Sequence, residues 1–226
     1  MSKSKYNVIN PDDVVADYGA DTFRMYEMFL GPIEQSKPWD TQGIEGVSKF
    51  IRRFWGLFFV NDKMSLVDEV PDKQELKILH QVIKKVSEDI EKFSFNTAVS
   101  ALMIAVNELK KLNCRKKDIL IPLLKLIAPF APYTSEGLWK LSGNESSIHL
   151  TDFPEYDESF LVQDSFEYPV CVNGKKRFIK SFPSDISKDE IENTVLDLDE
   201  LQRWIEGKTI IKTIVVPKRM INIVVK

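Results

Sequence analysis

The chain has 226 residues, a formal net charge of −3 and 43% hydrophobic residues, which fits one or two domains with a real core. The nearly balanced charge argues against a general polyanion binder, but it is compatible with local basic patches. Cys114, Cys171, His80 and His149 are too few and too scattered for a disulfide framework or a zinc site, so we expect a reducing compartment and no bound metal.

The first residues place hydroxyl groups beside an ammonium group. Ser2, Lys3 and Ser4 form a combination suited to phosphate oxygens, although no glycine-rich phosphate loop follows. No apolar run follows either, so a signal peptide is not predicted. The most apolar stretch, residues 119–132, is interrupted by prolines and a lysine and is too short to span a bilayer. We therefore expect a soluble, cytoplasmic protein.

Two short helices are predicted next, within a connector over residues 1–40. Asn10 suits an N-cap, Pro11 the first helical position, and the acids that follow suit the positive end of the helix. Gly19 is expected to end this helix. A second helix should begin at Asp21 and end at Gly31-Pro32.

Residues 41–151 have the periodicity of long helices. Apolar side chains recur every three or four residues along three segments, which places them on one face of each helix. These side chains are Ile44, Val47, Ile51, Phe54 and Phe58; Leu76, Leu79, Ile83, Val86 and Ile90; and Ala98, Leu102, Ala105, Leu109 and Leu112. Further helices are expected over 120–127 and 135–141. Short loops between such helices predict an antiparallel bundle.

Residues 152–164 are acidic and irregular, and we interpret them as a linker. Residues 165–226 then have strand character, and Asn173-Gly174 is a strong hairpin signal. A helical stretch over 186–205 and β-branched runs over 210–216 and 221–225 complete the pattern. The fold class predicted is mainly α, with an antiparallel helical bundle followed by a small α+β domain of β-β-α-β-β order.

Several motifs occur in an order that points to one family. Met1-Ser2-Lys3-Ser4 matches the last four letters of a KMSKS signature, and Tyr18-Gly19-Ala20-Asp21 with Arg24 matches a YGADxxR stretch. Together with residues 126–132 and Val172-Asn173-Gly174-Lys175, they resemble the C-terminal part of the bacterial leucyl-tRNA synthetases of class I. The signature's first lysine is absent, and Tyr6 stands where the family usually has glycine. Valyl and isoleucyl members are the closest alternative, but they usually end in a coiled coil or a zinc-bearing tail.

The resemblance implies a parent enzyme that joins leucine to tRNA(Leu) through leucyl-adenylate, using ATP and Mg²⁺. It assigns Lys3 to the ATP phosphates, with Ser2 and Ser4 holding the loop or donating to phosphate. It also implies that catalytic and editing domains precede this chain in the parent. Alone, the chain is expected to be inactive, to hold no ATP or metal, and to be a monomer.

The resemblance further assigns the bundle to the anticodon-binding type, with backbone contacts to tRNA expected more than base reading. Exposed basic groups are the candidate contacts. They are Lys49, Arg52, Arg53, Arg115, Lys116 and Lys117 in the bundle, and Lys175, Lys176, Arg177, Lys218 and Arg219 in two hairpin turns of the last domain. From Phe166 onward there are 11 basic and 9 acidic residues (net +2), against 20 and 25 before it (net −5). A solvated charged face is the alternative for each group. A freestanding helical interaction module without RNA binding is the alternative for the whole chain.

Overall fold

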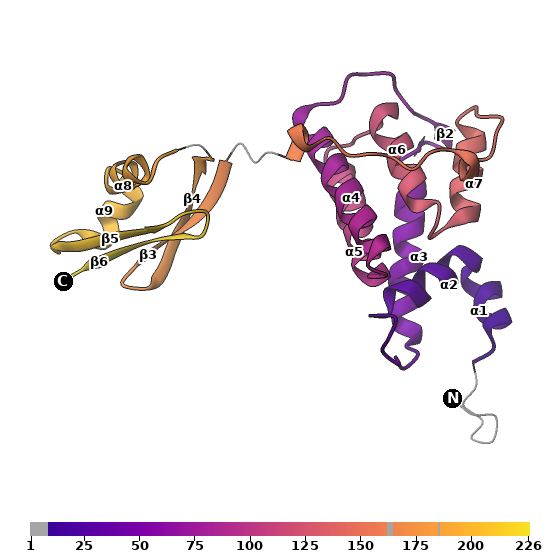
Figure 1. The fold of residues 1–226 in the computed structure, drawn as a ribbon, viewed down its shortest axis with the longest axis horizontal. Coiled ribbons are helices and arrows are strands. Elements are labelled where there is room, and N and C mark those ends of the chain that lie inside the picture. Colours follow the sequence, from indigo (N-terminus) through magenta and orange to yellow (C-terminus); the bar gives the residue numbers. More distant parts are fainter. Residues whose placement is uncertain (1–8, 162–164, 185) are drawn as a thin grey trace. The chain divides into compact units, whose positions relative to one another are not determined.

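The structure, a computed structural model, describes residues 9–161, 165–184 and 186–226. It divides into two compact units, Met1–Leu161 and Val162–Lys226 (Figure 1). The first unit is helical and the second is a sheet covered by helices. The predicted fold class, mainly α with a small α+β domain at the end, is confirmed.

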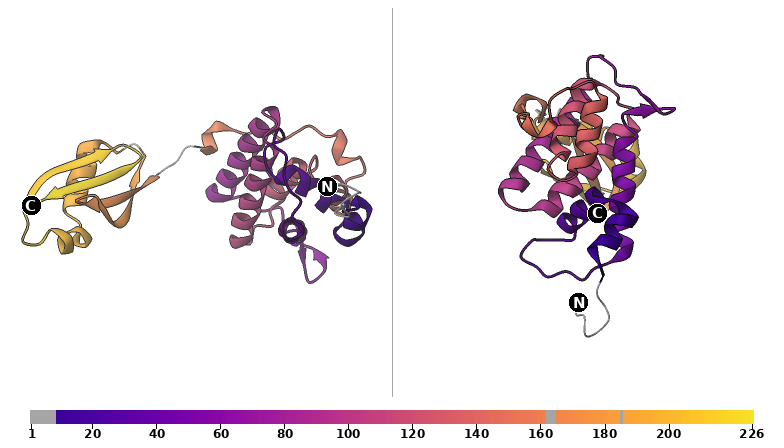
Figure 2. Two further views of the ribbon diagram at one scale, coloured as in Figure 1. Left: turned by 90° about the horizontal axis from the view of Figure 1, so that it is seen from below. Right: turned by 90° about the vertical axis from the view of Figure 1, so that its right-hand side faces the viewer.

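The helical unit consists of seven helices within the described residues, with a small hairpin and two 3-10 turns (Figures 1 and 2). The helices are α1 (Pro11–Tyr18), α2 (Ala20–Phe29), α3 (Thr41–Trp55), α4 (Lys73–Glu91), α5 (Phe95–Lys111), α6 (Lys117–Ile127) and α7 (Pro132–Leu141). The hairpin is β1 (Phe59–Val60) with β2 (Lys63–Met64), and the turns are η2 (Ile148–Leu150) and η3 (Glu158–Leu161).

The two connector helices form as their signals predict. The Asn10 side chain accepts the backbone N–H of Asp12 at 3.2 Å, and Pro11 occupies the first turn. Gly19 separates α1 from α2 with a φ of 87°, a conformation that a residue with a Cβ adopts only at a cost. The helix boundary at Gly19 is therefore set by the glycine.

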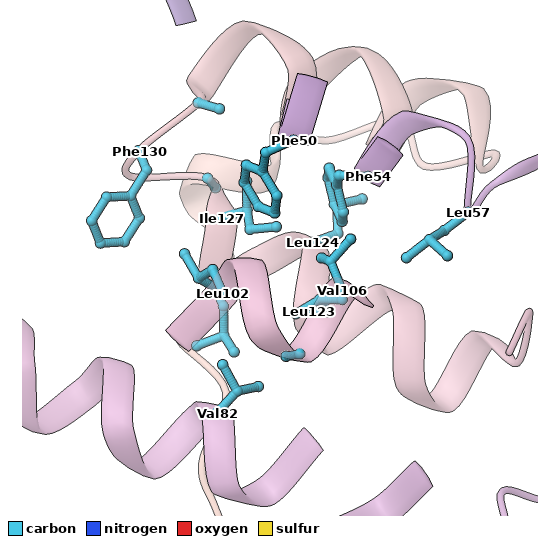
Figure 3. Close-up of a cluster of buried hydrophobic side chains, with 14 of the residues drawn as sticks. Phe50, Phe54, Leu57, Val82, Leu102, Val106, Leu123, Leu124, Ile127 and Phe130 are labelled. Carbon is cyan, nitrogen blue, oxygen red and sulfur yellow. The ribbon is translucent and has the colours of Figure 1, made fainter. Parts of the chain in front are cut away.

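One apolar core joins the helices of this unit. Figure 3 shows Phe50 and Phe54 of α3 pointing toward Leu124 and Ile127 of α6, with Leu102 of α5 beneath them. All five side chains are buried. The predicted alanines of α5 are buried as well, and α4 packs closely along α5.

Both short helices near the end of the bundle begin three residues earlier than predicted. The prediction began α6 at Leu120 and α7 at Ser135, whereas the structure begins them at Lys117 and Pro132. At α7 the cause is visible, because Pro132 fits the first turn and the distant Asp21 carboxylate accepts two of its free N–H groups.

Part of the segment predicted as a linker packs on the helical unit instead. The backbone N–H of Asp157 donates to Nδ1 of His80 at 3.0 Å, and the ring of Phe160 stacks on His80 with 4.6 Å between centroids. The turn η3 therefore lies against α4. The prediction treated the whole acidic stretch as irregular, although its aromatic residues provide the apolar surface for this contact.

The second unit is a four-stranded sheet with two helices on one face. The strands are β3 (Ser165–Val172), β4 (Lys175–Pro183), β5 (Ile210–Val216) and β6 (Met220–Val225), in the order β4-β3-β6-β5. The single helical stretch predicted over 186–205 is two helices, α8 (Lys188–Leu196) and α9 (Asp199–Ile205), because Leu198 between them has an extended backbone. Val195 of α8 and Leu201 of α9 are buried in one core with Val170 and Ile223 of the sheet.

Candidate nucleic-acid interface

The parallel pairing of β3 with β6 separates the two basic turns of the second unit. Val170 pairs with Ile221, and Val172 with Ile223, so the two strands run in the same direction. The turn that precedes β6 therefore lies where β3 begins, and the turn that follows β3 lies where β6 ends. The β3–β4 and β5–β6 turns therefore lie at opposite ends of the sheet (Figure 1), and the two predicted basic groups in them form two separate patches.

The β3–β4 turn is held rigidly against the end of β6. Asn173 and Gly174 both have positive φ, 48° and 77°, as a tight hairpin requires. The side chain of Asn173 exchanges two hydrogen bonds with the backbone of Val225, at 2.9 and 3.1 Å. The backbone N–H of Gly174 donates to the side chain of Asn222 at 2.9 Å. The exposed basic residues that follow this turn thus start from a fixed backbone.

More cations gather at this end than the sequence indicated. Lys226 and Thr209 exchange two backbone hydrogen bonds of 3.0 Å, which brings the start of β5 and Lys208 to the same end. We call this region the hairpin end. It comprises Lys175, Lys176, Arg177, Trp204, Lys208 and Lys226, all of which are exposed. Lys208 and Lys226 were missed because only the strand pairing brings them to this end.

Arg177 and Trp204 form the most specific contact of the hairpin end. The guanidinium carbon of Arg177 lies 4.0 Å from the centre of the Trp204 ring, while 40% of Trp204 stays exposed. Within the described part of the chain, no carboxylate lies at salt-bridge distance from Arg177. Sequence reasoning selected Arg177 but not Trp204, because the two lie 27 positions apart.

The opposite end of the sheet holds the other predicted pair. Lys218 takes a positive φ of 57° in the β5–β6 turn, and its backbone N–H donates to the hydroxyl of Tyr168 at 2.8 Å. Its ammonium lies 5.1 Å from the centre of the Phe166 ring. Arg219 beside it is exposed. This patch is the smaller of the two.

In the helical unit, the basic residues of α3 are exposed but already have protein partners. Lys49 pairs with Glu45 at 3.3 Å, and the guanidinium of Arg52 donates to the Ser48 hydroxyl at 2.9 Å. Arg53 donates to the side-chain oxygen of Asn107 on α5. An exposed ion pair such as Lys49–Glu45 is weak, about 0–1 kcal/mol, so it can exchange for a phosphate at little cost.

The two predicted lysines at the start of α6 differ, because Lys116 has a structural partner and Lys117 is exposed. The ammonium of Lys116 lies 2.7 Å from the buried Glu75 carboxylate, and only 17% of its side chain is exposed. This hydrogen bond raises the pKa of Lys116. The geometry therefore argues against Lys116 as a phosphate contact. Lys117 pairs with the exposed Asp68 at 2.9 Å. Arg115 is half-buried, and its backbone carbonyl accepts the backbone N–H of Val67.

The catalytic prediction for Ser2, Lys3 and Ser4 falls outside the described residues. Among the residues that the structure describes, no group of three or more His, Cys, Asp or Glu could hold a metal ion. In the same residues, no helix combines the length and the apolar character that crossing a membrane requires. Each unit by itself thus offers basic residues as candidate contacts to nucleic acid.

Comparison with known proteins defines the class to which this arrangement belongs. The family described as the anticodon-binding domain of tRNA ligase matches residues 72–192, more than half of the chain. The chain therefore belongs to this family. Over its whole length it is similar to bacterial leucine–tRNA ligases, which confirms the resemblance found in its motifs.

Two of these relatives show the extent of the similarity. The leucine–tRNA ligase of Porphyromonas gingivalis is 53% identical over 225 residues, and that of Bacteroides thetaiotaomicron is 54% identical over 226. The chain covers 24% of each, so it spans about a quarter of their length. A solved ternary complex of an Agrobacterium radiobacter LeuRS with tRNA and LeuAMS matches with a TM-score of 0.77 and 29% identity, covering 100% of this chain and 31% of that one.

Proposed function

We propose that this chain is the tRNA-binding C-terminal portion of a leucyl-tRNA synthetase. Similarity to leucine–tRNA ligases over the whole of this chain supports the leucine class over the valyl and isoleucyl alternatives. The parent enzyme would attach leucine to tRNA(Leu) through leucyl-adenylate, in the cytoplasm and as a monomer. The catalytic and editing domains would belong to the remaining three quarters of the enzyme.

In the parent enzyme, ATP with Mg²⁺ would supply the adenylyl group of leucyl-adenylate, with pyrophosphate as the leaving group. Ser2, Lys3 and Ser4 are the residues of this chain assigned to that step, and they lie outside the described residues. The described residues would contribute to tRNA binding instead. The helical unit offers Lys49, Arg52, Arg53 and Lys117, whose partners are exposed or uncharged.

The hairpin end is the strongest candidate for the tRNA backbone. Five cations gather there on a backbone that hydrogen bonds hold in place. This clustering of cations is the observation that supports the hairpin end over the opposite end of the sheet. Phosphate contacts position a protein on nucleic acid without reading bases. The hairpin end therefore suits the sugar–phosphate surface of a folded tRNA.

Binding of a tRNA(Leu) transcript, measured over a range of salt concentrations, tests the proposal. For a protein that neutralises phosphates, the logarithm of the binding constant falls linearly with the logarithm of the salt concentration. The double variant Lys175→Glu/Arg177→Glu should weaken binding and flatten the slope by about one per lost phosphate contact. Lys218→Glu/Arg219→Glu makes the same change of charge at the other end and should have the smaller effect. A freestanding interaction module would show no saturable tRNA binding even at low salt.

A further inference from the structure

We propose that Trp204 and Arg177 form a stacking platform for an exposed nucleobase of the bound tRNA. This inference rests on the proposed tRNA-binding function and adds to it a contact with a base rather than with the backbone. Trp204 of α9 is uncharged, so a search for basic residues does not find it. The ligand class is an unpaired base presented at the surface of the folded RNA.

The position of Trp204 on α9 leaves its ring at the surface. Leu201 and Ile205 are the residues of α9 that are buried in the core of this unit, and Trp204 lies on the flank of the helix beside them. Exposing 40% of a tryptophan forgoes a large apolar contribution to the core. The part of the indole that neither the core nor Arg177 covers therefore provides an apolar ring surface to solvent.

Arg177 gives this surface its RNA-binding character. It lies on β4, which is an edge strand of the sheet, and its guanidinium reaches over the indole at 4.0 Å. Guanidinium planes and aromatic rings can both stack with bases. The NH groups at the rim of the guanidinium remain available to phosphate.

Other cations of the hairpin end accompany the stacked pair. The ammonium of Lys208 donates to the backbone carbonyl of Trp204 at 3.0 Å, which places a cation at the C-terminal end of α9. Lys175 and Lys176 precede Arg177 on the same strand and are exposed. Proteins that bind exposed bases combine such a positive track for phosphates with an aromatic ring for stacking. All these elements occur together at the hairpin end.

The test compares two RNA probes and three variants of the full chain. The probes are a tRNA(Leu) transcript, which has exposed bases, and a fully paired RNA duplex of similar charge, which does not. Trp204→Ala should lower affinity for the tRNA about tenfold, with an unchanged salt slope, because stacking releases no counterions. It should leave duplex binding unchanged. Trp204→Phe should recover most of the tRNA affinity, because phenylalanine also offers a ring face.

Arg177→Lys supplies a second test that does not depend on removing a large side chain. It keeps the positive charge but loses the planar guanidinium. Its affinity for tRNA should fall several-fold relative to its affinity for the duplex. Circular dichroism and the thermal midpoint of each variant verify folding.

Two results separate the possible failures. If wild-type protein binds tRNA saturably and both Trp204→Ala and Arg177→Lys bind as tightly as wild type, or weaken both probes equally, the platform is refuted while the proposed function stands. If wild-type protein shows no saturable binding to tRNA at low salt, the proposed function fails, and the platform fails with it.

Discussion

Asp21 of α2 caps α7, which begins more than one hundred residues later: its carboxylate accepts the backbone N–H of Thr134 at 2.6 Å and that of Tyr133 at 3.2 Å. A carboxylate at a helix N-terminus satisfies free N–H groups and favours the positive end of the helix dipole. Arg24, one turn further along α2, donates to the carbonyl of Pro129 at 3.4 Å. The YGADxxR stretch thus joins the connector helices to the bundle by hydrogen bonds.

Replacing Asp21 should therefore destabilise the helical unit. Asp21 is buried, and we expect Asp21→Ala to lower the free energy of unfolding by about 1–2 kcal/mol, the usual loss for a removed N-cap. Asp21→Asn retains an accepting oxygen and should lose less. Urea unfolding followed by circular dichroism measures both. Asp17→Ala, at an exposed position of α1, is the control, and an equal effect at both positions would argue against the capping role.

The ion pairs of Lys116 and Lys117 should differ sharply in their contribution to stability. Lys116→Met leaves the Glu75 carboxylate, whose side chain is 4% exposed, buried without its cation, and breaking a buried pair in this way is strongly destabilising. Lys117→Met breaks a pair with an Asp68 side chain that is 78% exposed and should cost at most about 1 kcal/mol. The urea midpoint of each variant tests this order. If Lys116→Met proved as stable as Lys117→Met, the structural role of Lys116 would be wrong.

The attachment of η3 to α4 should depend on pH through His80. Burial lowers the pKa of His80 below its ordinary value of 6.5, while the Asp157 carboxylate opposes this effect. A lowered pKa means that the folded state favours the neutral His80 ring. The stability that His80 contributes to this contact is therefore complete above pH 6.5, and it is lost as pH falls through the folded-state pKa of His80. The physical reason is that a protonated Nδ1 cannot accept the N–H of Asp157.

Amide hydrogen exchange at Asp157 measures this contact. Its protection factor should be higher at pH 7 than at pH 5 in the wild-type protein. In His80→Phe the ring stack with Phe160 can persist, but the acceptor is gone, so protection should be low at both values. Lys84 lies over the Tyr156 ring and 3.9 Å from Glu158, so it also joins this segment to α4. Equal protection of wild type at pH 7 and pH 5 would contradict the role given to His80.

Local signals predicted most of the fold, and long-range pairing determined the rest. Helix periodicity and caps located the bundle, and Asn173-Gly174 located the hairpin, because these signals act within a few residues. The same signals cannot give the parallel pairing of β3 with β6, which depends on how α8 and α9 cross the sheet. For that reason the sequence placed Arg177 and Arg219 in similar turns but could not show that they lie at opposite ends of the sheet.

The candidate site, like the fold, could be predicted only where the signal is local in sequence. Basic residues in turns are visible in a sequence, whereas their partners are not. Lys116 resembled its neighbour Lys117 as a candidate until the structure showed it against the buried Glu75, 41 positions away. Trp204 gave no signal of its own, because an exposed tryptophan and a core tryptophan are the same letter until the fold places them.

A hybrid ligase tests the central claim most directly. In the Porphyromonas gingivalis leucine–tRNA ligase, the matching quarter would be replaced by this chain, and both leucine activation and leucylation of tRNA(Leu) would be measured. We predict that the hybrid performs both reactions, and that adding Lys175→Glu/Arg177→Glu raises the KM for tRNA while leaving leucine activation unchanged. A hybrid that activates leucine with ATP but leaves tRNA(Leu) uncharged would contradict the proposed function.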